Sequence, residues 1–186
     1  MSKIVRIANG QGFWGDSILG PVRLVREGPL DYLALDYLAE VTMSIMQKLK
    51  GRNPETGYAT DFIAMLDRIL PDLREKGIKV IANAGGVNPR ACMAATLELA
   101  RKKGCQGLKV GIIEGDDILD QIPDLIAQGE SLANMDDGRP LSAQPEAQKT
   151  MWMYTGSTGL RIRSEGIEGI QPITALRYVI PGDTTL

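Results

Sequence analysis

The most constraining feature of this chain is a short strand pattern near its start, followed at once by a glycine-rich turn. Residues 3–8 are rich in β-branched side chains, and Gly10, Gly12 and Gly15 follow with the spacing G-x-G-x-x-G. Glycine lets the backbone turn sharply or approach a ligand closely, because it has no Cβ. The pattern predicts a strand that ends in a ligand-binding loop or, as the plainer alternative, a tight strand-to-helix turn.

Composition bounds the class of protein. The chain has 186 residues, a net charge of −2 and no apolar run near the roughly 20 residues that a membrane span needs. The mild acidity argues against nucleic acid as a partner, because nucleic-acid binders usually carry a basic patch. A strand pattern begins almost at the first residue, which leaves no room for a secretory signal, so Cys92 and Cys105 are expected to be free thiols. We therefore expect a cytoplasmic protein.

The sequence contains no histidine. This excludes histidine-based acid–base catalysis, Ser-His-Asp and Cys-His nucleophiles, and zinc held by histidine. Proton transfer would use Asp, Glu, Lys, Tyr or Cys. A divalent metal, if one is bound, would be a hard ion such as magnesium held by oxygen ligands, and we assign no residue as a metal ligand.

Strand and helix patterns alternate through the first 128 residues. Apolar runs predict strands over 3–8, 32–36, 79–83 and 108–114, and amphipathic patterns predict helices over 17–26, 38–49, 60–76, 88–103 and 116–128. This order predicts an α/β fold, with a parallel sheet, Rossmann-like βαβ units and helices on both faces. The rhythm ends at Leu141, so we expect an α/β domain over 1–141 and an irregular tail over 142–186, apart from a strand pattern at 176–180.

Every predicted strand ends in, or is followed by, amides or carboxylates. In an open α/β sheet, ligands bind outside the carboxyl ends of the strands, so we expect a small-molecule ligand there. We assign ligand-binding roles to Asn9, Gly12, Gly15, Asn83, Gly85, Gly86, Asn88 and Asp116, and catalytic roles to Asp16, Asp36 and Glu40. Asp16 or Asp36 would be the general base, with Glu40 as a second carboxylate.

Plainer roles stay open for several of these residues. Asn88 before Pro89 is typical of a helix N-cap, and Asp16 and Asp116 could cap helices in the same way. Asp36 lies about 20 residues past the glycine turn, where a dinucleotide-binding unit places its ribose acid. Tyr58 lies in a predicted loop, and Asp61 lies at the start of the helix that follows it. The two side chains either reach the site from above, or they belong to a solvated loop in which Asp61 caps the helix.

Five short motifs together resemble the N-terminal region of the acyclic terpene utilization (AtuA-type) family, which was long a domain of unknown function. They are Gly12–Asp16 (GFWGD), Leu30–Leu33 with Asp36–Glu40 (LDYL and DYLAE), Gly57–Phe62 (GYATDF), Asn83–Pro89 (NAGGVNP) and Gly115–Asp117 (GDD). The resemblance covers about residues 3–141. Family members are longer, so this chain looks truncated or altered in its last quarter.

The resemblance implies a role in the catabolism of branched, terpenoid acyl compounds, with coenzyme A thioesters as substrates. An enzyme domain of this kind would carry out proton abstraction or hydration on an acyl thioester. Two alternatives stay open. One is a non-catalytic binding or scaffold subunit for acyl-CoA-processing enzymes, and the other is a dinucleotide-binding domain that uses Gly10, Gly12, Gly15 and Asp36. The oligomeric state, including a homo-oligomer, also stays open.

Overall fold

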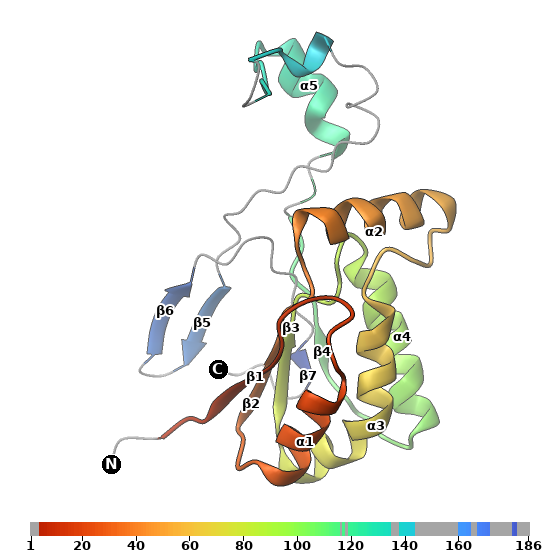
Figure 1. Cartoon of the computed structure of the whole chain (residues 1–186), viewed down its shortest axis with the longest axis vertical. Coiled ribbons are helices and arrows are strands. Elements are labelled where there is room, and N and C mark those ends of the chain that lie inside the picture. The colour runs from red at the N-terminus through yellow and green to blue at the C-terminus, as the bar shows by residue number, and fades with distance from the viewer. Residues whose placement is uncertain are drawn as a thin grey trace.

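The structure is a computed structural model, which describes residues 4–115, 117, 119–134, 138–143, 160–164, 167–171 and 180–181. Strands and helices alternate as the sequence predicted (Figure 1). The elements of the α/β part are β1 (Ile7–Gln11), α1 (Leu19–Glu27), β2 (Tyr32–Leu35), α2 (Glu40–Arg52), α3 (Thr60–Lys76), β3 (Lys79–Ala82), α4 (Pro89–Lys102) and β4 (Val110–Gly111). Further along the chain are α5 (Ile122–Ala127), β5 (Leu160–Ser164), β6 (Ile167–Gln171) and β7 (Ile180–Pro181), with short 3-10 turns at Leu119–Gln121 and Leu141–Ala143.

The first three strands form a parallel sheet in the order β1-β2-β3. Tyr32 pairs with Ile7 on one side and with Lys79 on the other, and Leu35 pairs with Ala82. This confirms the predicted α/β class and the parallel sheet. Because the strands run in one direction, the residues that follow β1, β2 and β3 meet at one edge of the sheet.

Three helices, α1, α3 and α4, lie side by side on one face of this sheet (Figure 1). Helices were predicted on both faces. The strand order β1-β2-β3 means that the sheet grows in one direction along the sequence. Because the crossovers between parallel strands are right-handed, crossovers that all lead in one direction place their helices on the same face. On the other face, Ile7 is 65% exposed.

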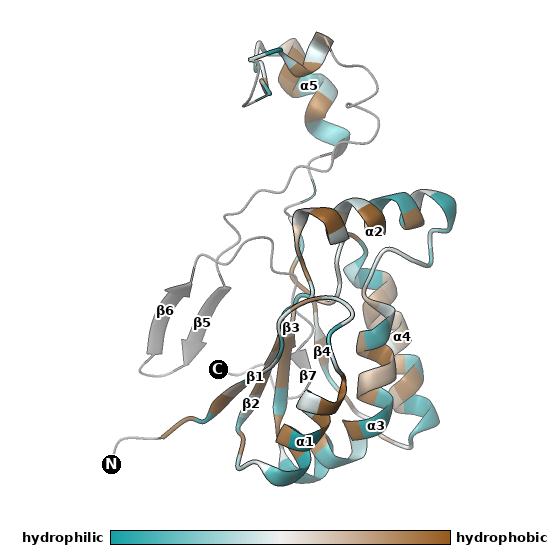
Figure 2. Cartoon of the chain, in the orientation of Figure 1, coloured by the Kyte–Doolittle hydropathy of each residue, from teal (hydrophilic) through white to brown (hydrophobic). Residues whose placement is uncertain are grey.

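The core lies between the sheet and these helices. Leu33 and Val80 from the strands, and Phe62, Leu66 and Ile69 from α3, are fully buried or nearly so. The last three residues recur at a helical spacing, so they form one apolar stripe that faces the sheet. Apolar segments accordingly line the inner side of the helices in Figure 2, and polar segments face outward. Within the described ranges, no helix has the length and apolar character that a membrane span needs.

A β-bulge at Gly10 alters the end of β1. Asn9 pairs with Ala34, and the register then shifts so that Gln11 pairs with Leu35. A Cβ on Gly10 would lie 3.0 Å from the side chains of Leu33, Leu35 and Pro21, so any other residue would force these side chains to shift. Bulges redirect side chains, and here Asn9 is exposed whereas Gln11 is 2% exposed.

The described residues after Leu141 include strands, although an irregular tail was predicted there. β5 pairs with β6 in an antiparallel hairpin, and β7 pairs antiparallel with β4. β7 also contacts β3. The remaining residues of the predicted strand at 176–180 lie outside the described part, and the domain division at Leu141 stays a prediction.

Candidate functional site at the carboxyl ends of the strands

Asp36 and Asn83 meet where β2 and β3 end. Leu35 and Ala82 are paired in the sheet, so the chain brings the residues near their carboxyl ends close together. The Asn83 side-chain amide donates to Oδ1 of Asp36 at 2.5 Å, and its carbonyl oxygen accepts from the backbone N–H of Tyr37 at 2.7 Å. Asn83 is 1% exposed, so both of its bonds are made away from water. The predicted juxtaposition of these two site residues is present.

The two oxygens of Asp36 have different surroundings. Oδ1 accepts a second bond, from the backbone N–H of Leu38 at 3.2 Å. No donor from the described residues reaches Oδ2. The side chain is half-buried. Asp36 is therefore a carboxylate whose orientation is set through one oxygen and whose other oxygen accepts no hydrogen bond from the described residues.

Tyr37 connects this pair to the end of β1. Its hydroxyl donates to Oε1 of Gln11, and the Gln11 amide donates to the backbone oxygen of Asp16 at 3.1 Å. Burial raises the pKa of Tyr37 well above its ordinary value, and the negative charges of Asp61 and Asp16 raise it further. Tyr37 is therefore a neutral hydrogen-bond donor at physiological pH.

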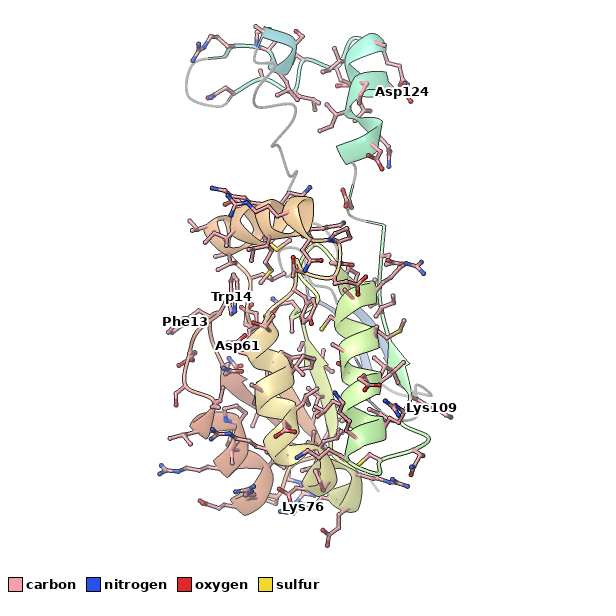
Figure 3. All side chains as sticks on the ribbon, turned by 90° about the vertical axis from the view of Figure 1, so that its right-hand side faces the viewer. Phe13, Trp14, Asp61, Lys76, Lys109 and Asp124 are labelled. Carbon is pink, nitrogen blue, oxygen red and sulfur yellow. The ribbon has the colours of Figure 1, made fainter. Side chains whose placement is uncertain are left out.

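The glycine-rich loop after β1 is held by two carboxylates. Asp16 accepts from the backbone N–H of Gly12 at 3.1 Å and from that of Ser17 at 2.6 Å. Asp61, in the first turn of α3, accepts from the N–H of Gly15 at 3.2 Å. Figure 3 shows Phe13, Trp14 and Asp61 on the same side of the molecule, where this loop passes the start of α3. The loop amides thus bind side chains of the protein itself.

Asp61 also carries a buried oxygen without a partner. Its Oδ1 is shielded from solvent, and no donor from the described residues reaches it. A buried acceptor that lacks a hydrogen bond costs free energy, so a donor that reached this oxygen would be favourable. Asp61 therefore contacts the glycine-rich loop, and a role for it toward a ligand stays a prediction.

The cluster suits proton transfer better than phosphate binding. Asp16, Asp36 and Asp61 bring three carboxylates to one edge of the sheet, and two of them occupy amides that a phosphate would need. Like charges repel, so an anionic phosphate is disfavoured beside them. Among the described residues, no group of three acidic or cysteine side chains is arranged to hold a metal ion.

Three other predicted site residues, Asn9, Gly85 and Gly86, have surroundings that differ from those of the cluster. Asn9 lies inside β1 on the exposed face, because the bulge extends the strand past it. Gly85 and Gly86 are buried, and a Cβ on Gly86 would lie 2.3 Å from the sulfur of Met46. The absence of a side chain at Gly86 therefore lets α2 and the 57–58 loop pack closely here, and the ligand-binding role of both glycines stays a prediction.

Asn88 is the N-cap of α4, as its plainer reading proposed. Its side-chain oxygen accepts from the N–H of Ala91 at 3.3 Å, and its amide donates to the carbonyls of Pro54 and Thr56 at 2.6 and 2.7 Å. Glu40 begins α2, but its side chain is not described. Asp116 lies outside the described residues.

Gln11 and Tyr37 complete the cluster and were not predicted as site residues. A glutamine in a strand and a tyrosine in an apolar run carry no pattern that separates them from surface or core residues. The signal that would have identified Gln11 is the adjacent Gly10, because a glycine inside a strand often marks a bulge. Tyr37 directly follows Asp36, so it shares the edge once β2 is placed correctly.

A family model described as "Acyclic terpene utilisation family protein AtuA" matches residues 5–162. The match covers most of the chain and runs past Leu141. No curated protein and no solved structure matches the sequence.

Proposed function

We propose that this chain, which belongs to the acyclic terpene utilisation family, binds a branched acyl thioester at the carboxyl ends of β1, β2 and β3 and abstracts a proton from it. The family supports a setting of acyclic terpene utilisation. The acyl thioester, the catabolic direction and the cytoplasm as the location are parts of our proposal.

The observation that carries the proposal is the asymmetry of Asp36. Oδ1 is held by Asn83 and by the N–H of Leu38, while Oδ2 has no donor among the described residues. A general base must be oriented and must also keep one lone pair for the proton that it takes. Asp36 meets both conditions, and we therefore assign it the role of the base ahead of Asp16, whose two oxygens both bind backbone amides.

The reaction that fits this site is removal of a proton from the carbon next to a thioester carbonyl. Oδ2 of Asp36 takes the proton, and the electron pair left on carbon delocalises onto the thioester oxygen as an enolate. Return of the proton to the same carbon completes an exchange. The neutral Tyr37 hydroxyl and the Asn83 amide hold the surrounding network without adding further charge.

A dinucleotide is the weaker alternative. In a dinucleotide-binding loop the turn amides are free for the pyrophosphate. Here Asp16 and Asp61 already occupy the amides of Gly12 and Gly15. Gly10 serves packing of the sheet against α1, because its missing Cβ makes room for Leu33, Leu35 and Pro21.

Solvent exchange tests the proposal. We would incubate the protein with isovaleryl-coenzyme A in D₂O and follow deuterium incorporation at C2 by NMR. We expect incorporation with the natural chain and a loss of at least about 100-fold in Asp36→Asn, in the range that a positioned base contributes. Asp67→Asn is the matched control, because Asp67 lies on the outer side of α3 in an ion pair with Lys103.

Thermal shifts separate the proposal from its rivals. Stabilisation by isovaleryl-coenzyme A without any C2 exchange would favour the binding or scaffold role. Stabilisation by NAD, and not by the thioester, would favour the dinucleotide reading. A ligand at 100 times its dissociation constant stabilises the folded state by about 2.7 kcal/mol, which such a measurement detects.

A further inference from the structure

A hollow lies at the end of the sheet opposite the candidate site, between the turn before β3 and the segment that leads into β4. Its volume is about 370 Å³, which is within the range of small-molecule sites. Lys79, the first residue of β3, lines the hollow, whereas Asn83 of the candidate site follows the last residue of the same strand. None of the described residues that line the hollow belongs to the candidate site.

Apolar side chains make up part of the lining. They come from the end of α3, from the residue before β3 and from the segment before β4, and they are Leu70, Leu73, Ile78 and Leu108. Leu73 and Ile78 are almost fully buried, whereas Leu108 is half-buried and keeps apolar surface open to a ligand. Because burial of apolar surface favours binding, this part of the lining suits a hydrocarbon group.

Two glycines add backbone to the lining without a side chain. Gly77 ends α3 in a left-handed conformation, and Gly107, in the segment before β4, also has a positive φ. No atom of the described residues lies within 4 Å of a Cβ built at either position. The two turns therefore leave space that a ligand can use.

The charged side chains of the described lining are all basic. They are Arg74, Lys79 and Lys109, and the last of these lies in the segment that leads into β4 (Figure 3). Lys79 lies over the ring of Tyr32 at 5.6 Å and pairs with no carboxylate of the described residues. The whole chain has a net charge of −2, so positive charge is concentrated here on a mildly acidic protein. Such a concentration attracts an anion.

Arg74 offers the edge of its guanidinium that binds a carboxylate elsewhere in this chain. Arg90 donates from Nε and Nη2 to the two oxygens of Glu114, at 3.0 and 2.6 Å. Arg74 donates from Nη1 to the carbonyl oxygen of Gly104 at 3.2 Å, and no acceptor from the described residues reaches its Nε or Nη2. A carboxylate is a planar acceptor that pairs with this edge through two parallel hydrogen bonds.

We propose that this hollow binds a small carboxylate with an apolar body. Arg74 and Lys79 hold the carboxylate, and the hydrocarbon part lies against Leu108 and the apolar side chains beside it. The inference does not rest on the proposed function, because the hollow and the carboxylate cluster lie at opposite ends of β3.

Octanoate is the probe, and two related molecules separate its parts. Octanol has an apolar chain of the same length without the charge, and acetate has the charge without the chain. We would titrate each into the ¹⁵N-labelled full chain and follow amide chemical shifts. Octanoate should move the amides of Gly77, Lys79 and Gly107 most, and its dissociation constant should be at least about tenfold lower than that of octanol or acetate.

Paired variants test the two halves of the hollow. Arg74→Gln should weaken octanoate binding by about tenfold or more, and Arg68→Gln, an exposed arginine of the same helix outside the hollow, should not. Leu108→Ala should weaken octanoate and leave acetate unchanged. Leu97→Ala, at an exposed position of α4 outside the hollow, is its control. Thermal melting without ligand establishes that each variant is folded.

The proposal fails on any of three results. Octanoate could cause no shifts, or shifts confined to other surfaces. Octanol could bind as tightly as octanoate, which would show that the basic side chains select nothing. Finally, Arg74→Gln and Arg68→Gln could have the same effect on octanoate, which would show a general attraction of anions to the surface and not a site.

Discussion

The side-chain amide of Asn83 donates to Oδ1 of Asp36 at 2.5 Å and so joins the ends of β3 and β2. The same asparagine accepts from the backbone N–H of Tyr37. One buried side chain thereby orients both the proposed base and the backbone that follows it. This arrangement explains why an asparagine ends an otherwise apolar strand.

Asn83→Ala should lower the free energy of unfolding by about 2–3 kcal/mol, because it leaves a carboxylate oxygen and a backbone N–H short of a partner. Urea denaturation measures this change. Asn53→Ala, at an exposed position in the loop after α2, should change stability by less than about 1 kcal/mol. Equal losses of stability in the two variants would show that the hydrogen bonds of Asn83 stabilise the fold no more than an exposed loop residue does.

Gly10→Ala should destabilise the protein by about 1–3 kcal/mol, because its new methyl group would press on Leu33, Leu35 and Pro21 at 3.0 Å. Gly12→Ala is the matched control, since nothing lies within 4 Å of a Cβ at that position. Thermal denaturation compares the two variants. A larger loss in Gly12→Ala would contradict the packing role given to Gly10.

Asp61→Asn should be at least as stable as the natural chain, whereas Asp61→Ala should be less stable by about 1 kcal/mol. An asparagine oxygen can still accept from the N–H of Gly15. The neutral amide also replaces a charged carboxylate that has one buried oxygen without a partner. Urea midpoints measure both. If Asp61→Asn were the less stable of the two, the charge itself would be needed, and a bound donor would have to be sought.

Stability should fall as pH rises above about 9. Burial raises the pKa of Cys92 from 9.0 to about 12, and burial also raises the pKa of Tyr37. Above the unfolded-state pKa, the unfolded chain loses protons that the folded chain keeps, so the folded state loses stability until its own pKa is passed. Urea midpoints between pH 8 and 12 should show this decline, and Cys92→Ala and Tyr37→Phe should each flatten it. If the decline were unchanged in both variants, the assignment of this pH dependence to Cys92 and Tyr37 would be wrong.

Much of the fold could be predicted from the sequence, because local signals there agree with the packing. The helix at 60–76 has the predicted bounds, since its apolar stripe and the stop at Gly77 coincide. β3 and its pairing with β2 follow from short apolar runs between helices. The sequence pattern could not show which face of the sheet each helix covers. That face is set by the strand order and not by the sequence of any one helix.

The candidate site could be predicted only in part. The closeness of Asp36 and Asn83 could be predicted because the ends of parallel strands share an edge, and that rule depends on chain direction alone. Asn9 was misplaced because the bulge at Gly10 adds residues to β1, a consequence of packing against Leu33 and Leu35. Gly85 and Gly86 carry the signature of a ligand loop, but the pattern could not show that Met46, distant in the sequence, packs against Gly86.

The most direct test of the central claim is a titration of the ¹⁵N-labelled protein with isovaleryl-coenzyme A, followed by amide chemical shifts. We predict that the largest shifts fall on Gly12, Gly15 and Leu38, whose amides border the carboxylates at the ends of β1 and β2. Asp36→Asn should reduce them, and Asp67→Asn should leave them unchanged. Shifts confined to other surfaces, or saturating shifts that are the same in Asp36→Asn, would contradict a ligand site built on Asp36.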